Sequence, residues 1–543
     1  MLDLTEDCFG SAGFADARAR KKAKLNKGRG AYIGHDAAGR PCHSDQMSAI
    51  LLCGGARSLK GSLVVPWLVD GRLGGKHGLD HIVTLDWKGQ DTVIAAQQVS
   101  NGRFVFAFNP RSKCDLPFNR MNPCSHLVSD SPTLIPDVLA LMESWIPVTD
   151  PRAAYFQRNA QKIVTAICVT GVRHYGFITL PMLADLSAGF GEATDDWLAF
   201  EYEIAQQPEP QINEVALMLQ RLREGTHDGG GWEGIKGEIT KSFICMIDPQ
   251  LREALSPPFD FCFSELTKPV CPPCLVSIME DLEFAETSGP VVRALFNSAL
   301  IWKRRALSAR PQFWCLQEIG NVGAWPLAQD LATISAGYGI RTAYVVQSTE
   351  QLNNLKAGAS KVIPNSCGTH IYLGTRCPHQ ASLIQRQLGH MTLEYPDERA
   401  IEQAKVAQRR ALMSLFNKDG DPFTAMMDAT EQKRQAMRPQ KMGRELRGID
   451  EILNEENGKA FVFMPGVLEK PAYLTIRPYW QRTDLRGRYL GDPFHNAPGT
   501  VAIRTRFGNR IVREVHEPVP HIYRDWPQYR DSGMWRYVKG YRP

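Results

Sequence analysis

The stretch of sequence that decides the fold is residues 49–65, which read AILLCGGARSLKGSLVV. Residues 49–53 form an unbroken apolar run, which is typical of a strand covered on both faces of a parallel sheet. A glycine-rich basic loop and a second apolar run follow, so the pattern predicts strand, loop and helix. Such a loop binds phosphate, because backbone N–H groups at a helix start attract anions. The predicted nucleotide-binding residues are Gly54, Gly55, Ala56, Arg57, Ser58, Leu59, Lys60, Gly61 and Ser62.

This loop departs from the usual pattern G-x-x-x-x-G-K-[ST] at two positions. Gly54 and Lys60 have the expected spacing, and Lys60 is predicted to reach the β and γ phosphates. Leu59 stands where the second glycine is expected, and Gly61 stands where a hydroxyl is expected, with Ser62 one step later. A leucine disfavours the positive φ of that turn. Two interpretations therefore stay open: a nucleotide site and a structural glycine-rich turn.

A second apolar run, FWCLQE, ends at Glu318 and would supply the other half of an ATPase site. Glu318 is predicted to orient the attacking water. Gln317 is neutral where an aspartate usually orders the Mg²⁺ shell, so we expect weakened metal affinity. Gln347 follows another predicted strand and is a candidate sensor of the γ-phosphate. Ser62 and Gln317 are the candidate metal residues, and the alternative for each position is an ordinary element end.

The fold class follows from further apolar runs that are continuous rather than alternating, which favours a mostly parallel sheet with helices on both faces. The predicted strands are 49–53, 81–85, 104–108, 274–278, 313–316, 342–346, 369–373 and 460–464. Between about 131 and 255 the pattern changes to helical periodicity, which predicts an inserted all-α domain. A charged helical segment over about 397–447 is predicted to lie on the surface.

Composition excludes several classes of protein. The 543 residues carry 63 Lys and Arg against 58 Asp and Glu, a net charge of +5, and 43% are hydrophobic, which excludes general disorder and collagen-like character. No apolar stretch reaches the roughly 18–20 residues of a membrane helix, and the N-terminus lacks a secretory pattern, so we expect a soluble chain.

The thirteen cysteines are odd in number and scattered, which favours reduced thiols. Cys271 and Cys274 have a metal or redox spacing, but no second pair completes a site. Ordinary thiols are therefore favoured over redox or metal chemistry at this pair.

The charge is concentrated near the C-terminus. Residues 500–543 contain nine Lys and Arg and four Asp and Glu, and aromatic residues are interleaved with them. Basic and aromatic residues together can bind nucleic acid, which makes this tail a candidate nucleic-acid surface. The favoured alternative is a tail that packs on its own domain with solvated arginines. A basic run at 18–29 would contact nucleic acid or an anionic membrane, or form a solvated helix.

Taken in order, these segments resemble the TraG/TraD-like coupling proteins of conjugation and type IV secretion, which are RecA-like ATPases. The family loop P-T-R-S-G-K-G is similar to residues 55–61, which makes Gly61 normal and Leu59 the anomaly. The motif L-D-x-K-G-E is similar to LDWKGQ, and D-E-F-x-x-L-G to QEIGNVG. AGYGIR and VQSTEQL match A-G-Y-G-I-R and V-Q-x-x-x-Q-L closely. The resemblance runs from about residue 10 to about 480.

The resemblance implies an α/β, RecA-like mostly parallel sheet flanked by helices, with ATP and Mg²⁺ as cofactors and a homo-hexamer as the assembly. The implied partners are DNA with its relaxase, or effector proteins, and components of the secretion channel. The implied location is the cytoplasmic face of the bacterial inner membrane. Because the family's membrane helices would precede residue 10, the chain is expected to be either a cytosolic portion or a naturally soluble homologue tethered through a partner.

The expected domains are a lead-in at 1–45, a nucleotide-binding domain at 46–130 and 256–480, the all-α domain at 131–255 and a basic aromatic tail at 481–543. Two other functions stay open: a catalytically degenerate docking platform with the same fold, and a soluble DNA translocase. Leu59 and Gln317 favour the platform, whereas Lys60 and Glu318 favour a working ATPase.

Overall fold

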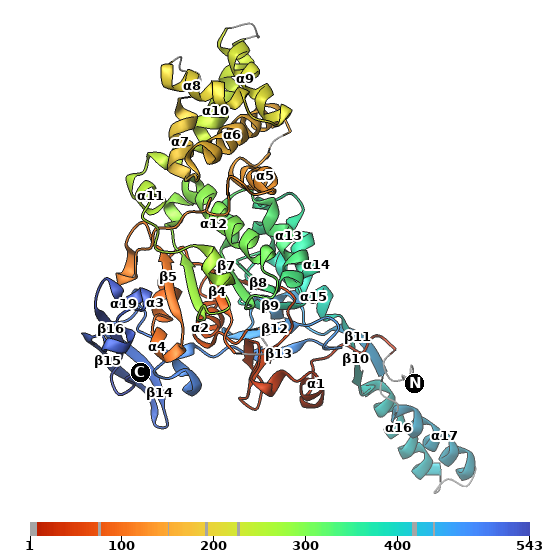
Figure 1. Ribbon diagram of the computed structural model, residues 1–543. Helices are drawn as coiled ribbons and strands as arrows, with labels where there is room; N and C mark the ends of the chain where they lie inside the picture. The colour runs from red at the N-terminus through yellow and green to blue at the C-terminus, as the bar shows by residue number, and fades with distance from the viewer. Residues whose placement is uncertain are drawn as a thin grey trace.

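The centre of the molecule is one large sheet with strand order β2-β1-β13-β12-β9-β3-β8-β7-β4-β6-β5 (Figure 1). The structure is a computed structural model that describes residues 8–73, 78–149, 151–189, 194–224, 229–414, 421–437 and 440–543. The parts of the predicted segments that fall at 1–7, 74–77, 150, 190–193, 225–228, 415–420 and 438–439 lie outside the described residues.

Seven neighbouring strands of this sheet are parallel, and each overlaps a predicted run, so the prediction of a mostly parallel sheet is confirmed. In β3, Leu51 and Cys53 point into one hydrophobic core, and Ile50 and Leu52 point into the other. Burial on both faces explains why the runs are continuous. The seven strands are β3 (Ile50–Gly54), β4 (His81–Leu85), β5 (Phe104–Phe108), β6 (Cys274–Ile278), β7 (Gln312–Gln317), β8 (Ile340–Val346) and β9 (Thr369–Leu373).

Four antiparallel strands extend the sheet beyond β9. The predicted run 460–464 is β12, which pairs with β9, whereas the other three strands were not predicted. Two of those come from the region that the sequence analysis treats as a lead-in. The four strands are β12 (Lys459–Phe463), β13 (Ala472–Thr475), β1 (Ala31–His35) and β2 (Pro41–Ser44). The exposed basic run before them contains helix α1 (Ala17–Lys22).

Helices cover both faces of the parallel strands. On one face, helix α2 (Gly61–Asp70) and the short α3 (Gln90–Ile94) contribute to one core, and α4 (Gln98–Asn101) follows them. On the opposite face, four helices contribute to the other core, together with strand residues and the all-α region. The four helices are α12 (Ala285–Arg305), α13 (Pro326–Ile334), α14 (Ala359–Ser366) and α15 (Pro378–Leu388). The fold is therefore α/β, as predicted.

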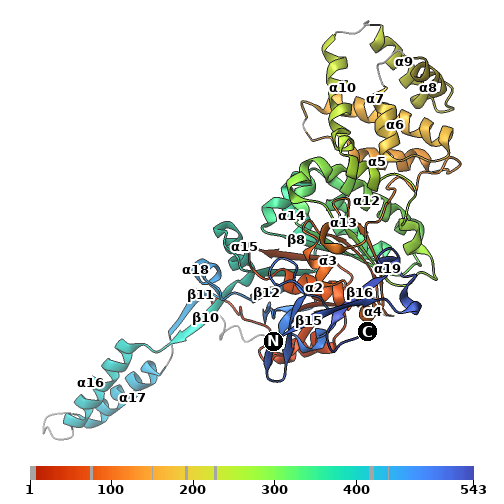
Figure 2. The same ribbon diagram turned by 90° about the vertical axis from the view of Figure 1, so that its left-hand side faces the viewer.

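An all-α region forms one end of the molecule (Figures 1 and 2). It interrupts the sheet between β5 and β6, as the sequence pattern predicts. Its helices are α5 (Leu134–Trp145), α6 (Ala154–Tyr175), α7 (Leu180–Ala188), α8 (Asp195–Ala205), α9 (Pro210–Arg223), α10 (Gly229–Ser242) and α11 (Pro249–Ala254). Among the described residues, no single helix is long and apolar enough to cross a membrane; only α6 and α7 together pass that test, with a 116° bend between them.

A helical arm projects from the opposite side of the molecule (Figure 2). Its base is an antiparallel pair, β10 (His390–Tyr395) and β11 (Gln440–Glu445), and its helices are α16 (Glu398–Ser414) and α17 (Pro422–Ala436). The prediction of helix over 397–447 is right for α16 and α17 and wrong for β11. Pairing with β10 over six residues on each strand satisfies the β11 backbone and overrides the local pattern. Helix α18 (Ile449–Leu453) follows.

The C-terminal residues form a separate small sheet of β14 (Thr500–Thr505), β15 (Gly508–Pro518) and β16 (Met534–Val538). Helix α19 (Pro527–Arg530) lies against β5, the edge strand of the large sheet. There the Gln528 side chain accepts a hydrogen bond from the Val105 N–H at 3.1 Å and donates one to the Arg103 carbonyl at 3.1 Å. The tail thus covers an edge that would otherwise expose unpaired backbone groups.

Candidate functional site

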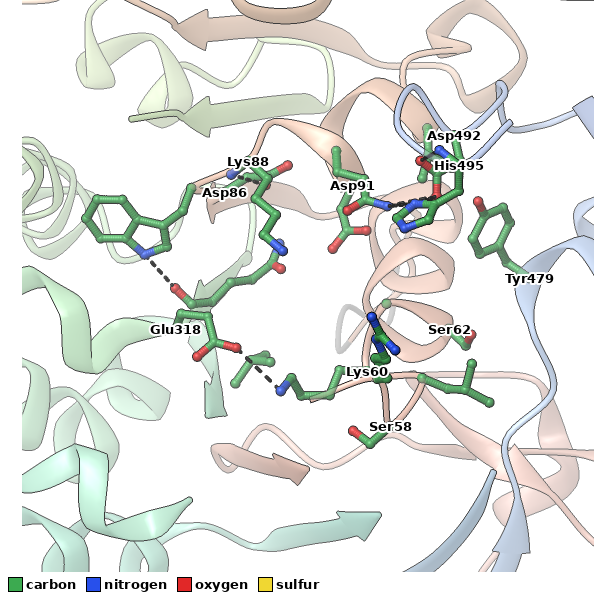
Figure 3. A pocket seen from close by; sticks show the side chains of 18 of the residues that line it. Ser58, Lys60, Ser62, Asp86, Lys88, Asp91, Glu318, Tyr479, Asp492 and His495 are labelled. Atoms are coloured by element: carbon green, nitrogen blue, oxygen red, sulfur yellow. Dashed lines mark hydrogen bonds and ion pairs between the residues drawn. The ribbon is translucent and has the colours of Figure 1, made fainter. Parts of the chain in front are cut away.

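A cavity of about 860 Å³ opens at the carboxyl ends of the parallel strands (Figure 3). Residues from the loop after β3 and from the ends of β4, β7 and β8 line it. The C-terminal segment between Tyr479 and Ala502 forms the other wall of the cavity. Ligands of parallel α/β sheets bind in this position, outside the carboxyl ends of the strands.

Residues 55–62 of the predicted loop all line the cavity, and Gly54 is the last residue of β3. The two glycines are required because the neighbouring chain approaches closely. A Cβ at Gly54 would lie 2.8 Å from the Leu373 carbonyl oxygen, and one at Gly55 would lie 2.7 Å from the Gly374 carbonyl oxygen. Such distances leave no room for a side chain.

The turn of the loop is held in a left-handed conformation at two residues that are not glycine. Arg57 has φ +60° and Leu59 has φ +68°. The usual loop has a glycine at position 59 because the turn needs a positive φ, and here the same backbone is adopted by a leucine. For a residue with a Cβ, this conformation costs about 1–2 kcal/mol. The loop therefore keeps this turn at the expense of backbone strain.

Lys60 lies inside the cavity and contacts both the start of the loop and Glu318, the residue that follows β7. Its Nζ donates hydrogen bonds to the carbonyls of Gly54 at 2.6 Å and Gly55 at 3.4 Å. The same Nζ lies 3.4 Å from Glu318 Oε1, and Figure 3 shows this ion pair across the cavity. The structure thus brings together two of the three predicted catalytic side chains.

Strand β7 ends at Gln317, and Glu318 follows with φ +46°. The Gln317 carbonyl accepts a hydrogen bond from Trp87 Nε1 at 3.1 Å, and the Glu318 N–H donates to the Val345 carbonyl at 2.8 Å. These backbone contacts hold both side chains at the cavity. Among the described residues, Gln317 Nε2 and Glu318 Oε2 are buried without a hydrogen-bond partner.

The other predicted residues also reach this region. Gln347 is exposed at the end of β8 and lines the cavity, and its N–H donates to Gln351 Oε1 at 3.0 Å. Ser58 is 4% exposed, and its Oγ has no partner among the described residues. Ser62 also lines the cavity, but Figure 3 shows it toward Tyr479 and well apart from Glu318.

Three aspartates that were not predicted as site residues also line the cavity. Asp86 Oδ2 accepts hydrogen bonds from the Thr92 N–H at 2.9 Å and the Thr92 hydroxyl at 2.8 Å. Asp492 Oδ2 accepts one from Gln90 Nε2 at 2.7 Å. Burial, followed by the charges of Asp86 and Asp492, raises the pKa of Asp91 from 3.8 to about 8. Local sequence did point to Asp86 and Asp91, since both lie in or next to the LDWKGQ stretch.

The C-terminal wall of the cavity was not predicted. Tyr479 is buried in it, and Trp480, Asp492 and His495 also line the cavity. His495 Nδ1 lies 3.2 Å from Asp492 Oδ2, so the wall carries its own polar contacts. Because this segment lies about four hundred residues from the loop it faces, no local spacing signals the contact.

The basic tail divides into packed aromatics and exposed arginines. The hydrophobic cluster of this region contains buried Tyr529, Trp535 and Tyr537, as expected for a tail that packs on its own domain. The β14–β15 hairpin instead exposes a fully accessible Phe507. Its exposed arginines are Arg504, Arg506, Arg510 and Arg513.

Within the described ranges, no cluster of three or more His, Cys, Asp or Glu side chains is arranged to hold a metal ion by itself. Cys271 and Cys274 have their sulfur atoms 3.6 Å apart, and all thirteen cysteines are free thiols.

Residues 6–443 match the family described as Type IV secretory system Conjugative DNA transfer. No curated protein matches the sequence.

Solved structures of the bacterial conjugative coupling protein TrwB are similar to this fold. TrwB in complex with ADP and Mg²⁺ is 13% identical with a TM-score of 0.57, and the match covers 86% of this chain and 94% of that chain. TrwB with a non-hydrolysable ATP analogue is 13% identical with a TM-score of 0.57, covering 86% and 93%. Unbound TrwB is 12% identical with a TM-score of 0.56, covering 86% and 93%. The likeness at these identities concerns the fold, which is RecA-like with an all-α domain.

Proposed function

Since this chain belongs to the type IV secretory system conjugative DNA transfer family, as a TraG/TraD-like coupling protein, we propose that it is a coupling ATPase. It binds ATP with Mg²⁺, recruits a DNA–relaxase complex or an effector protein, and passes that cargo to a type IV secretion channel. It works at the cytoplasmic face of the bacterial inner membrane.

The observation that carries this proposal is the pairing of Lys60 with Glu318, 3.4 Å apart, in a cavity at the carboxyl ends of parallel strands. The residues present fit a nucleotide. Ser58 Oγ and Glu318 Oε2 are buried in the described cavity wall without partners, and buried polar atoms of this kind need hydrogen bonds that a polyphosphate and its waters supply. The TrwB structures with ADP and Mg²⁺ and with an ATP analogue support the same interpretation.

In this function each predicted residue has a separate role. Backbone N–H groups of the loop hold the phosphates, and Lys60 leaves Glu318 to neutralise phosphate charge. Glu318 orients the attacking water, and Gln347 contacts the γ-phosphate from the end of β8. ATP supplies the free energy of phosphoryl transfer. Ser62 and Gln317 would be the weak members of the metal shell.

The assembly and partners follow from the family. We expect a hexamer in which a neighbouring subunit contributes an arginine to each site, as in other RecA-like ATPases. The all-α region would receive the cargo, and the exposed arginines of the β14–β15 hairpin would contact DNA phosphates.

A docking platform without turnover is the second candidate, because two observations favour it. Leu59 strains the loop at φ +68°, and Gln317 replaces the acidic residue that usually helps to hold Mg²⁺. Under this alternative the cavity binds nucleotide to shape a surface, and another ATPase moves the cargo.

The test is ATP hydrolysis with Mg²⁺, with and without DNA, by the parent chain and the Lys60→Ala and Leu59→Gly variants. We expect turnover that DNA stimulates and that Lys60→Ala abolishes. No turnover by the parent, with activity gained in Leu59→Gly, would support the platform instead. Activity that persists in Lys60→Ala would contradict the assignment of this cavity.

A further inference from the structure

This site lacks the two side chains that usually bind the nucleotide's Mg²⁺ in phosphate-loop ATPases. In phosphate-loop ATPases, Mg²⁺ is held by a hydroxyl after the loop lysine and by an aspartate at the end of a neighbouring strand. Here those positions are Gly61, which has no side chain, and Gln317, which is a neutral amide. The Ser62 hydroxyl lies away from Glu318 (Figure 3). The metal shell therefore needs an anionic oxygen from another element.

Asp91 occupies the space next to the missing hydroxyl. It lies in the first turn of helix α3, and its Oδ1 is 3.4 Å from the point where a Cβ of Gly61 would stand. A hydroxyl residue at Gly61 would thus contact this carboxylate. The Gln317 side chain is also close enough to interact with Asp91. Asp91 therefore lies between both positions that usually hold the metal.

Asp91 is also less engaged than the other two aspartates of this cavity, because the side chain that interacts with it is the neutral Gln317 amide. Asp86 is engaged by Thr92, and Asp492 is engaged by Gln90 and His495. Among the described residues, no Lys, Arg or His side chain forms an ion pair with Asp91, although it lies near two other negative charges. Asp91 thus has no direct ion pair among these residues, although the positive charge of Lys88 also acts on it.

A single carboxylate is enough for the ion in question. Mg²⁺ usually takes one or two carboxylates together with substrate phosphates and several waters, rather than a cage of protein ligands. This agrees with the lack of a three-residue metal cluster in the described part of the chain. The phosphates, held by the loop that begins α2, would supply the remaining anionic oxygens.

We propose that Asp91 is the carboxylate ligand of the nucleotide-bound Mg²⁺, in place of the aspartate that Gln317 has lost and the hydroxyl that Gly61 lacks. The assignment rests on the proposed function, because it requires a nucleotide in this cavity. It also accounts for a family-like loop with a neutral residue at the end of β7, because the acidic group is supplied by helix α3, which follows β4.

The test compares binding of the non-hydrolysable analogue ADPNP in EDTA and in Mg²⁺, by isothermal titration calorimetry on the full chain. The parent chain should bind at least about tenfold more tightly with Mg²⁺. Asp91→Asn should bind equally well in both conditions, with an affinity in EDTA no weaker than that of the parent. Electron paramagnetic resonance of Mn²⁺ in place of Mg²⁺ should show the bound ion in the parent and its loss in Asp91→Asn.

Two further variants make the result specific. Adding Gln317→Asp to Asp91→Asn should restore most of the Mg²⁺ increment, which is the gain in ADPNP affinity in Mg²⁺ over that in EDTA. The double variant returns the carboxylate to the usual strand end. Asp492→Asn removes an equal charge from the same cavity and should keep the increment. Asp91→Ser replaces the Asn variant if that variant does not fold.

A Mg²⁺ increment that Asp91→Asn retains would overturn the assignment, and so would its loss in Asp492→Asn to the same extent. If the folded parent bound ADPNP neither in EDTA nor in Mg²⁺, the proposed function itself would fail, and this assignment with it. Binding in EDTA without any Mg²⁺ increment in the parent would overturn the Asp91 assignment alone.

Discussion

At the scale of single residues, Leu59 is held in a strained backbone conformation by its contacts with the surrounding chain. Its backbone is left-handed, and its Cδ1 lies 3.5 Å from the point where a Cβ of Gly458 would stand. The side chain is partly buried at the edge of the cavity. Contact with the segment before β12 therefore offsets part of the backbone strain at this leucine.

The Leu59 backbone predicts a difference between two small substitutions. Leu59→Gly and Leu59→Ala both remove the leucine side chain from its neighbours, but only the glycine relieves the left-handed strain. We expect the glycine variant to have a free energy of unfolding about 1 kcal/mol higher than the alanine variant. Urea unfolding of both variants measures this difference. Equal stabilities would mean that the turn relaxes when the leucine is removed.

Asp91 predicts a pH dependence of stability without Mg²⁺. Its pKa is about 8 in the folded chain against an ordinary value of 3.8, so the folded state binds the extra proton between these values. Its contribution to stability is complete below about pH 4 and is lost as the pH rises toward 8. In EDTA, the melting temperature of the parent should therefore fall relative to Asp91→Asn across this range.

The control for this pH dependence is Asp115→Asn. The Asp115 side chain is 86% exposed, so its substitution should shift the melting temperature equally at both ends of the range. If the melting temperatures of the parent and Asp91→Asn differ by the same amount from about pH 4 to pH 8, burial of the Asp91 carboxyl is contradicted.

Much of the candidate site could be predicted at the residue scale because its motifs are local. The loop residues, Glu318 and Gln347 each follow an apolar strand directly, and strands that are parallel neighbours bring their ends together. Their placement around one cavity agrees with that reasoning, while their chemical roles stay predictions. Tyr479 and Asp492 could not be found in this way, because only the folded chain brings them to the loop.

At the scale of elements, the C-terminal hairpin separates two properties that the sequence mixes. Period-two alternation places Val501 and Ile503 in the core while Arg504 and Arg506 are exposed near the turn. The aromatic residues of the tail mostly pack, but Phe507 stands free at the tip. The hairpin therefore presents cations around one exposed ring, a combination suited to phosphates and unpaired bases.

The hairpin predicts a change in the salt dependence of DNA binding. Replacing Arg504, Arg506, Arg510 and Arg513 with alanine should reduce the slope of log K against log salt by about 0.9 for each phosphate that the hairpin no longer neutralises. Fluorescence anisotropy with labelled DNA over a salt series measures the slope.

The matched control for the hairpin replaces four basic residues of the arm, Arg399, Lys405, Arg409 and Arg410, which also removes four positive charges. It should leave the slope nearer that of the parent. Equal slopes for both quadruple variants would show that net charge alone, and not the hairpin, sets the salt dependence.

Apolar strands that are buried on both faces could be predicted from the sequence, whereas exposed strands could not. All eight predicted runs are strands of the large sheet, because strands covered on both faces are apolar throughout. Strand β11 is mostly exposed and polar, and no residue of β10 is fully buried, so neither HMTLEY nor QKMGRE shows the continuous apolar run of a core strand. Their pairing depends on residues brought together across the whole arm, and that information is not local.

At the scale of the whole molecule, three parts extend from one sheet: the all-α region, the arm and the C-terminal sheet (Figures 1 and 2). The first two arise as insertions between strands, which change the pattern of the sequence and can be recognised there. The C-terminal segment is different. It returns across the molecule, and its contact between Asp492 and Gln90 joins the end of the chain to the wall of the cavity.

Because Gln528 and α19 cover the edge strand β5, removing them should expose that edge to other chains. A chain ending at residue 519 should associate through the uncovered strand, because free backbone groups at a sheet edge pair with other chains. Light scattering at rising protein concentration measures this association. Gln528→Ala in the full chain keeps the cover and removes two hydrogen bonds, so it should lower stability by about 1–3 kcal/mol and stay dispersed. A truncated chain that associates no more than the full chain would contradict the role of the cover.

The order of synthesis gives this cover a further consequence. Strand β5 is complete after about one hundred residues have left the ribosome, while Gln528 is among the last to emerge. Through most of its synthesis, each nascent chain therefore carries an adhesive strand that neighbouring nascent chains on the same messenger can pair with. Slow translation or crowded polysomes should accordingly lower the yield of this protein more than its final stability would indicate.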